Sequence, residues 1–324
     1  MTPELWINLI APGIIIPLGT FGNGLALWTL FFSKILKQRV ASIFLITLYL
    51  ADTSSILSGY LAQWIVNLSR TDISSYYDQS SITYLNNTSI QYIECQPGDG
   101  FIVLFVYHYA SFTVSALTMA ALTIERVIVV FSPFQNSAQK QQKPLIILIL
   151  IGIVITAILI YLPMVLTETE LYWNPETGNF DLYGPYPTWS LSIAMLSAFA
   201  IIFPANIALV VKLHKEHKFR RSNSDQSKLH DEDENPGCAP ILRTIDLKMT
   251  IVLIGISIAF ILLTIPHRFL VVYATLKDMR IEELPVAITR QFCHINFSCN
   301  SIFYFFLASE CREELKKTCL CYLK

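Results

Sequence analysis

The sequence predicts an all-α membrane protein, a seven-transmembrane helix bundle with a short amphipathic eighth helix. Of its 324 residues, 53% are hydrophobic and only 15% are charged, whereas a soluble domain carries about a quarter charged residues. The apolar residues also form runs long enough for a bilayer core, which needs ~20 residues of helix. In addition, the basic residues gather between alternate runs, as expected for a chain that crosses a membrane repeatedly.

Seven apolar runs are long enough to be membrane spans within one domain covering residues 1–324. Backbone groups in lipid must be satisfied within the protein, which favours helices, and the runs lack the alternation of a membrane β-barrel. The first run follows a stretch without Lys or Arg, so we interpret it as a retained span rather than a signal peptide. The predicted spans are approximately Leu9–Phe32, Ser42–Val66, Phe101–Phe131, Leu145–Leu166, Trp189–Leu213, Lys248–Tyr273 and Pro285–Leu307.

The Lys and Arg residues set the predicted orientation. Of the 23 basic residues, 18 lie at or after the ends of spans one, three, five and seven, and five lie toward the opposite side. Because basic residues favour the cytoplasmic side, we expect a multi-pass plasma-membrane protein with its N-terminus outside and its C-terminus in the cytoplasm. The polar segment SNSDQSKLHDEDENPG between spans five and six predicts a flexible linker.

Two kinds of covalent modification are consistent with this orientation. Glycosylation sequons lie on the predicted outer side at Asn67, Asn86 and Asn87. On the inner side, Cys319 and Cys321 follow the amphipathic stretch SECREELKKTC, which we expect to lie along the membrane surface with the cysteines palmitoylated. Two free cytosolic thiols are the alternative.

Short motifs occur in a characteristic order along nearly the whole chain. They are GNGLALW in span one, LYLAD in span two, ERV at the end of span three, FILLTIP in span six and NSIFY in span seven. With this order and spacing, the chain resembles the rhodopsin-like (class A) G-protein-coupled receptors. The stretch INFSCNSIFYFF is most similar to neuropeptide receptors of the FMRFamide type.

This resemblance implies a function and a set of partners. It implies a cell-surface receptor that binds an extracellular ligand, a neuropeptide, and activates a heterotrimeric G protein through outward movement of span six. It further implies arrestin and a receptor kinase as partners, and a membrane-parallel eighth helix at about 309–322. Neither nucleic acid nor a cofactor other than a sodium ion is expected.

Asp52 is an ionisable residue inside predicted span two, which makes it a functional candidate because charges in lipid are costly. One interpretation is a protonated carboxyl bonded to a neighbouring helix. The other is a sodium site, for which the resemblance places Ser115, Asn296 and Asn300 around Asp52. All four side chains carry the oxygen atoms that a hard cation requires.

Glu125 and Arg126 lie at the cytoplasmic end of span three, where they can pair at the water boundary. The resemblance implies that Arg126 also pairs with Asp246 at the inner end of span six and thereby holds the resting state. The alternative is a pair that only marks the interface, as snorkelling charges do. Further residues implied in switching and G-protein coupling are Pro133, Phe134, Asn300 and Tyr304.

A ligand cavity is expected between the outer halves of the helices. His108 lies eighteen residues before Arg126, which is five turns at 3.6 residues per turn, so both share one helix face. Because the resemblance places His108 where amine receptors carry an aspartate, a biogenic amine is not expected. The candidate ligand-binding residues are Gln63, His108, Tyr109, Phe112, His267, Arg268, Arg290 and His294.

The two arginines of this set predict the chemistry of the ligand. Arginine binds carboxylates through two parallel hydrogen bonds, so we expect an acidic group or a peptide terminus in the ligand. The alternative is that Arg268 and Arg290 pair with Glu282, Glu283 or loop acids of the chain itself.

Several other functions are disfavoured. No Lys lies between Pro285 and Leu307 to bind retinal, and no nucleophile–base constellation, nucleotide loop or metal spacing indicates an enzyme. Internal repeats and broken helix pairs, which are typical of transporters, are also missing. A non-signalling receptor-like protein remains an alternative, because Thr264 and Ser301 stand where the resembled family has switch residues. The family's outer disulfide is not expected either, because the loop 167–188 contains no Cys.

Overall fold

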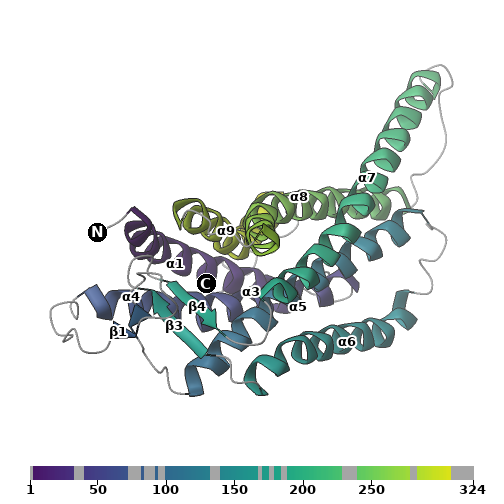
Figure 1. The fold of residues 1–324 in the computed structure, drawn as a ribbon. Helices are drawn as coiled ribbons and strands as arrows, with labels where there is room; N and C mark the ends of the chain where they lie inside the picture. The colour runs from purple at the N-terminus through teal and green to yellow at the C-terminus, as the bar shows by residue number, and fades with distance from the viewer. Residues whose placement is uncertain are drawn as a thin grey trace, which may run out of the picture.

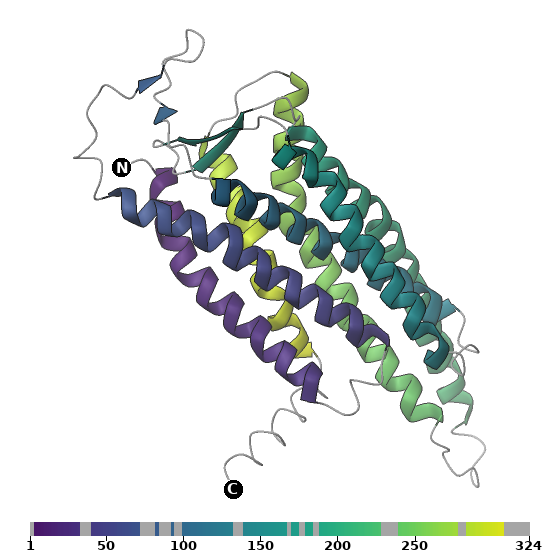
Figure 2. The same cartoon turned by 90° about the horizontal axis from the view of Figure 1, so that it is seen from below.

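A computed structural model describes residues 3–32, 40–71, 82–83, 92–93, 99–131, 139–166, 170–174, 179–183, 188–227, 239–277 and 283–307. Long helices run side by side and form an elongated bundle (Figures 1 and 2). The predicted all-α membrane bundle is confirmed. Outside span two, the spans correspond in order to α1 (Pro3–Phe32), α5 (Asp99–Phe131), α6 (Gln139–Leu166), α7 (Thr188–Ser227), α8 (Ala239–Lys277) and α9 (Glu283–Leu307).

Span two is interrupted in its middle. It consists of α3 (Val40–Ser55), a π-helical turn η1 (Ile56–Tyr60) and α4 (Leu61–Thr71). The Leu61 N–H bonds to the Ile56 carbonyl, five residues back instead of four. Turns of this kind are rare and occur frequently at functional sites. The helical pattern of the sequence did not predict this interruption.

Helix α7 is longer than its predicted span. It continues through the KLHKEHKFRR stretch to Ser227 and extends beyond the rest of the bundle (Figure 1). The prediction that SNSDQSKLHDEDENPG is a flexible linker is therefore wrong for its first six residues, because Lys, Arg and Glu before it favour helix and an existing helix adds residues at low cost. The predicted eighth helix at 309–322 lies outside the described residues.

Helix α9 carries several polar residues along its length. Among the described helices, six are long and apolar enough to cross a membrane by length and composition alone, and α9 is not one of them. Its polar residues nevertheless face inward, since Gln291, His294, Asn296 and Asn300 are all buried. Helix α9 packs between α1 and α8, so the protein interior and not lipid surrounds its polar side chains.

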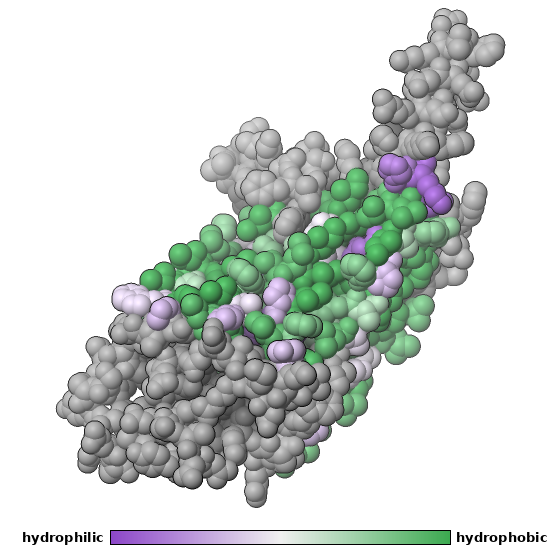
Figure 3. All heavy atoms as spheres, turned by 45° about the horizontal axis from the view of Figure 1, so that its top comes forward, coloured by the Kyte–Doolittle hydropathy of each residue, from purple (hydrophilic) through white to green (hydrophobic). Residues whose placement is uncertain are grey.

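The described part of the bundle face drawn in Figure 3 is largely hydrophobic. Helix α6 is the clearest case, because Leu148, Ile155 and Leu159 are each more than half exposed. In water such a surface would favour association, whereas in lipid it is the expected solvent-facing surface. The surface therefore agrees with a multi-pass membrane protein.

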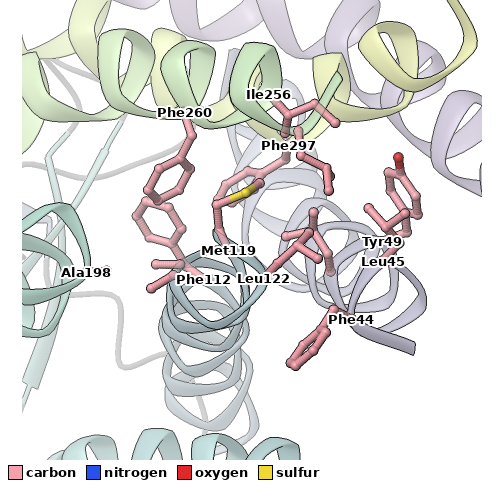
Figure 4. Close-up of a cluster of buried hydrophobic side chains, with 14 of the residues drawn as sticks. Phe44, Leu45, Tyr49, Phe112, Met119, Leu122, Ala198, Ile256, Phe260 and Phe297 are labelled. Atoms are coloured by element: carbon pink, nitrogen blue, oxygen red, sulfur yellow. The ribbon is translucent and has the colours of Figure 1, made fainter. Parts of the chain in front are cut away.

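Aromatic and aliphatic side chains fill the centre of the bundle (Figure 4). Phe112 and Met119 of α5 meet Phe260 of α8 and Phe297 of α9 in one buried cluster. The rings of Phe112 and Phe297 pack nearly at right angles, with centroids 4.8 Å apart, an arrangement that aromatic quadrupoles favour. This cluster fixes the inner faces of α5, α8 and α9 relative to one another.

A small antiparallel sheet lies outside the bundle, at the end where α1 begins (Figure 2). Its strands, in order, are β1 (Ile82–Thr83), β2 (Tyr92–Ile93), β3 (Glu170–Asn174) and β4 (Asn179–Tyr183). The pairing of Ile93 with Trp173 joins the loop after span two to the loop after span four. Backbone pairing thus connects these two loops, a feature that the sequence analysis missed.

Candidate functional site

One cavity brings together all eight candidate ligand-binding residues, which come from α4, α5, α8 and α9. Its lining also includes Ser58 and Gly59 of the π-helical turn η1 and apolar residues such as Leu104, Phe105 and Phe297. The positions of these residues place the cavity in the half of the bundle nearer the β-strands, far along α5 from Arg126. Residues separated by more than 200 positions therefore share one site. A role in ligand binding remains a prediction.

Arg268 is a buried cation in this cavity. Its side chain is 6% exposed, and its guanidinium carbon lies 4.6 Å from the ring centroid of Phe112 and 6.0 Å from that of Tyr109. The Nε atom has no hydrogen-bond partner among the described residues. Arg290 lines the same cavity, and none of the described lining residues is Asp or Glu. The cavity is therefore positively charged, with aromatic rings stabilising one of its cations.

The ring of His108 is held by Ser55, the last residue of α3, and by Gly59 of the π-helical turn. Its Nδ1 lies 2.9 Å from the Ser55 carbonyl oxygen and 3.0 Å from the Ser55 hydroxyl. A carbonyl oxygen only accepts, so Nδ1 donates the hydrogen, and Nε2 of the neutral ring is an acceptor. The ring packs on Gly59 so closely that a Cβ there would lie 2.2 Å from His108 Cγ. Gly59 therefore leaves the space that the ring occupies.

Hydrogen bonds link the cavity to the first helix. The His294 ring stacks on Tyr60 with centroids 3.8 Å apart, and the Tyr60 hydroxyl donates to Gln291 Oε1. Gln291 Nε2 in turn donates to Asn8 Oδ1 over 2.8 Å. Sequence reasoning missed Tyr60, Gln291 and Asn8, although polar residues within predicted spans are a signal of such contacts.

The His267 side chain of α8 contacts a hydroxyl group of α9. Its Nδ1 lies 3.3 Å from the Thr289 hydroxyl, which also bonds to the Pro285 carbonyl. This contact joins α8 to α9 beside the cavity. It sets the relative position of the two helices that carry the arginines.

Two of the three polar residues predicted around Asp52, Ser115 and Asn300, contact its carboxyl group. The Ser115 hydroxyl donates to Oδ1 over 2.6 Å, and Asn300 Nδ2 donates to Oδ2 over 2.8 Å. Asp52, Ser115, Asn296 and Asn300 are all completely buried. Both polar atoms of the Asn296 side chain, as well as Asn300 Oδ1, have no hydrogen-bond partner among the described residues. A buried carboxyl group, together with an oxygen without a partner on Asn300, which contacts it, fits a bound cation with oxygen ligands.

Arg126 forms a two-pronged ion pair with Glu125 at the other end of α5. Its Nε lies 2.5 Å from Oε2, and its Nη2 lies 2.8 Å from Oε1. One turn before this pair, the Thr123 and Ser257 hydroxyls lie 3.4 Å apart and connect α5 to α8. The predicted pairing of Glu125 with Arg126 is thus present in the structure. Asp246 and Tyr304 lie in α8 and α9, but their side chains, and all of Pro133 and Phe134, lie outside the described residues.

The predicted modification sites are not described. Asn86, Asn87, Cys319 and Cys321 lie outside the described residues, and so does the side chain of Asn67 in α4. Cys95, the one cysteine on the predicted outer side, also lies outside them. Within the described part of the chain, Cys293 and Cys299 are free thiols. The same residues contain no group of three or more His, Cys, Asp or Glu side chains arranged to hold a metal ion.

A seven-helix bundle with a hydrophobic surface, a polar cavity at one end and an arginine ion pair at the other defines a heptahelical membrane receptor. Residues 22–304 match the family described as "7 transmembrane receptor (rhodopsin family)". The chain therefore belongs to the rhodopsin family of G-protein-coupled receptors, which are receptors and not enzymes, with a ligand and a G protein as partners.

A solved structure agrees with this assignment. The crystal structure of squid rhodopsin matches with a TM-score of 0.71 and 16% sequence identity, over 100% of this chain and 88% of that chain. At this identity the likeness shows the fold alone. No curated protein matches the chain.

Proposed function

We propose that this protein is a plasma-membrane receptor for an extracellular peptide, which it binds in the cavity between η1, α4, α5, α8 and α9. One observation carries the proposal: eight residues chosen from sequence line a single cavity that contains two arginines. The cavity suits a ligand with an acidic group, because a carboxylate neutralises a buried cation. The N-terminus is outside and the C-terminus is cytoplasmic in this proposal.

Cells that express the receptor test the peptide proposal directly. A panel of synthetic neuropeptides is applied, and coupling is read with reporters for several G-protein classes. We expect at least one peptide to raise signalling in receptor cells and not in cells that express an Arg126→Ala variant at equal surface density. Activation by non-peptide ligands alone would reject the peptide part of the proposal and leave the family assignment intact.

The intracellular proposal is that Arg126 holds spans three and six together in the resting state. Arg126 is 5% exposed, and the Thr123–Ser257 contact already brings α5 and α8 together one turn away. Asp246, at the inner end of α8, is the proposed second partner of Arg126. On activation α8 swings outward and opens a cleft for the G protein, with Pro133 and Phe134 on its rim and Asn300 and Tyr304 taking part in the switch.

Replacing Asp246 tests this resting-state contact. We expect Asp246→Ala to raise ligand-independent G-protein signalling several-fold, because Arg126 then loses its partner on α8. The measurement is basal reporter activity at matched surface expression, with Lys215→Ala, an exposed residue of α7, as the control. Unchanged basal activity in Asp246→Ala would contradict the proposed contact.

We also propose that Asp52, Ser115, Asn296 and Asn300 hold a sodium ion. The support is the set of buried oxygens described above, which includes amide oxygens without partners. Bound sodium would supply positive charge next to the Asp52 carboxylate. The four side chains, from α3, α5 and α9, would then be held together around one charge.

The remaining expectations concern the surface of the receptor. We propose glycans on Asn67, Asn86 and Asn87 and acyl chains on Cys319 and Cys321, together with arrestin and a receptor kinase as cytoplasmic partners. Their support is the predicted orientation, which places the sequons outside and the two cysteines inside.

A further inference from the structure

The cavity contains two neighbouring groups with opposite hydrogen-bonding roles. Arg268 offers donors and a positive charge, whereas His108 offers an acceptor at Nε2. Both lie against Tyr109, since the His108 and Tyr109 ring centroids are 5.3 Å apart and the Arg268 guanidinium carbon lies 6.0 Å from the Tyr109 centroid. A ligand that satisfies both groups must carry both an anion and a hydrogen-bond donor.

We propose that the cavity receives the C-terminal residue of a peptide as a free carboxylate, which binds Arg268, while the backbone N–H of that residue donates to His108 Nε2. This inference rests on the proposed peptide-receptor function. Within one residue the backbone nitrogen and the carboxyl carbon are separated by about 2.5 Å, as standard bond lengths and angles require. One C-terminal residue therefore presents both an anion and a donor to the two groups, which line the same cavity and both lie beside Tyr109.

The state of Arg268 favours a carboxylate over a C-terminal amide. Arg268 is only 6% exposed. Within the described part of the chain it forms no ion pair, and its Nε has no hydrogen-bond partner. Leaving a buried charge without a counter-ion is costly. An amide brings no negative charge and adds two N–H donors beside a cation, and an N-terminal ammonium adds a second positive charge.

The orientation of His108 favours a ligand donor. The Nδ1 edge of the ring faces Ser55 and Gly59, because Gly59 approaches Cγ and Nδ1 most closely. Nε2 lies on the opposite edge of the ring, and no hydrogen bond joins it to any described residue. An acceptor that is fixed by its neighbours and lines a cavity selects ligands that donate to it.

The test uses small probes that reproduce one C-terminal residue. They are N-acetyl-phenylalanine, its C-terminal amide, and its N-methyl derivative, which keeps the carboxylate but lacks the N–H. The aromatic side chain suits a cavity lined by Phe105, Tyr109 and Phe112. Binding to the purified full-length receptor in detergent is measured as the rise in melting temperature over a range of probe concentrations.

We expect the free acid to stabilise the receptor at concentrations at least tenfold lower than either the amide or the N-methyl acid. Arg268→Gln should bring the acid-to-amide ratio close to one, and Arg268→Lys should give an intermediate ratio, because it keeps the charge but not the two-pronged geometry. His108→Asn keeps a donor near the Ser55 carbonyl and removes the Nε2 acceptor. This variant should abolish only the difference between the acid and its N-methyl derivative, and the preference for the acid over the amide should remain.

Specific outcomes would overturn the inference. Equal or absent stabilisation by the acid and the amide would do so, as would an acid preference that persists in Arg268→Gln. Thr156→Ala, a substitution on the exposed face of α6, is the matched control and should behave as the unmodified receptor does.

The same measurements separate this inference from the proposed function. If the acid binds with the expected pattern and no peptide activates a G protein in cells, the carboxylate site stands and the peptide-receptor function falls. If amidated peptides activate the receptor as potently as their free acids, the function stands and the carboxylate inference falls.

Discussion

At the scale of single residues, the cavity depends on the absence of a side chain at Gly59. The His108 ring occupies the place where a Cβ would stand, and Ser55 binds its Nδ1. Gly59 lies in the π-helical turn η1, which packs against α5, the helix that carries His108. The absence of a Cβ at Gly59 thus sets the position of His108 Nε2, the acceptor that we expect the ligand to bind.

Gly59→Ala should displace His108 and weaken binding of N-acetyl-phenylalanine by about tenfold or more, which corresponds to ~1.4 kcal/mol. The added Cβ would lie 2.2 Å from His108 Cγ, so the ring must move. Gly152→Ala is the control, because a Cβ on Gly152 meets nothing within 4 Å. The melting-temperature titration described above measures both variants, and equal affinities would contradict the predicted role of Gly59.

Asp52→Asn should abolish stabilisation of the receptor by sodium. Sodium at ten times its Kd would stabilise the unmodified protein by ~1.4 kcal/mol through binding linkage, and the variant lacks the carboxylate that would attract it. Melting temperatures are compared in sodium chloride and in N-methylglucamine chloride at equal ionic strength. A sodium response retained in Asp52→Asn, at the level of Thr156→Ala, would exclude this site.

At the scale of elements, the contact between α1 and α9 explains how a polar helix is held in a membrane protein. Gly19 and Gly22 let α1 approach the hydroxyls of Ser298 and Ser301. Ser298 also bonds to the Ile15 carbonyl over 3.2 Å. Small residues that allow close helix approach, together with hydrogen bonds between helices, are typical of packing in lipid.

Gly19→Ala should destabilise the bundle by ~1–3 kcal/mol, the usual effect of overpacking. The new Cβ would lie 2.3 Å from Ser298 Oγ and 2.7 Å from Ile56 Cδ1, and both residues are buried. In Gly24→Ala the Cβ meets nothing within 4 Å, so this control should be as stable as the unmodified protein or slightly more stable. The melting temperatures of the detergent-solubilised proteins decide, and equal values would contradict the close packing of α1 on α9.

At the scale of the whole molecule, the helices have apolar outer faces and a partly polar interior. Asp52, Asn23 and the residues of α9 supply the interior polarity. The Asn23 side chain, for example, donates to the Phe297 carbonyl over 3.0 Å and joins α1 to α9. In a low-dielectric interior no water competes for these hydrogen bonds, so they hold the helices together while the bundle stays closed.

We expect tags on the two termini to report from opposite sides of the plasma membrane. An N-terminal tag should bind antibody in intact cells. Most basic residues lie on the side of the bundle opposite the N-terminus, and that side is expected to face the cytoplasm. A C-terminal tag should bind antibody only after permeabilisation. Two tags accessible from the same side would contradict seven crossings of the membrane.

The sequence by itself determined the transmembrane bundle and the candidate residues of its cavity. Long apolar runs and the distribution of Lys and Arg reflect the surrounding membrane and can be recognised without knowing how the helices pack. Because backbone groups in lipid must be hydrogen-bonded within the protein, such runs are expected to form helices. His108, Arg268 and Arg290 could be chosen because charged and polar residues within such runs are rare. The spacing of His108 and Arg126 along one helix was likewise readable from a period of 3.6 residues.

Only the tertiary structure decided how these residues meet. The link from Tyr60 through Gln291 to Asn8 and the pairing of β2 with β3 join segments far apart in sequence. The π-helical turn at Ile56–Tyr60 is local, but it lies where α5 packs against span two. Such contacts depend on how the helices pack, which a local pattern of residues does not encode. The orientation of the His108 ring is therefore a property of the folded bundle, because Ser55 and Gly59 fix it from a neighbouring helix.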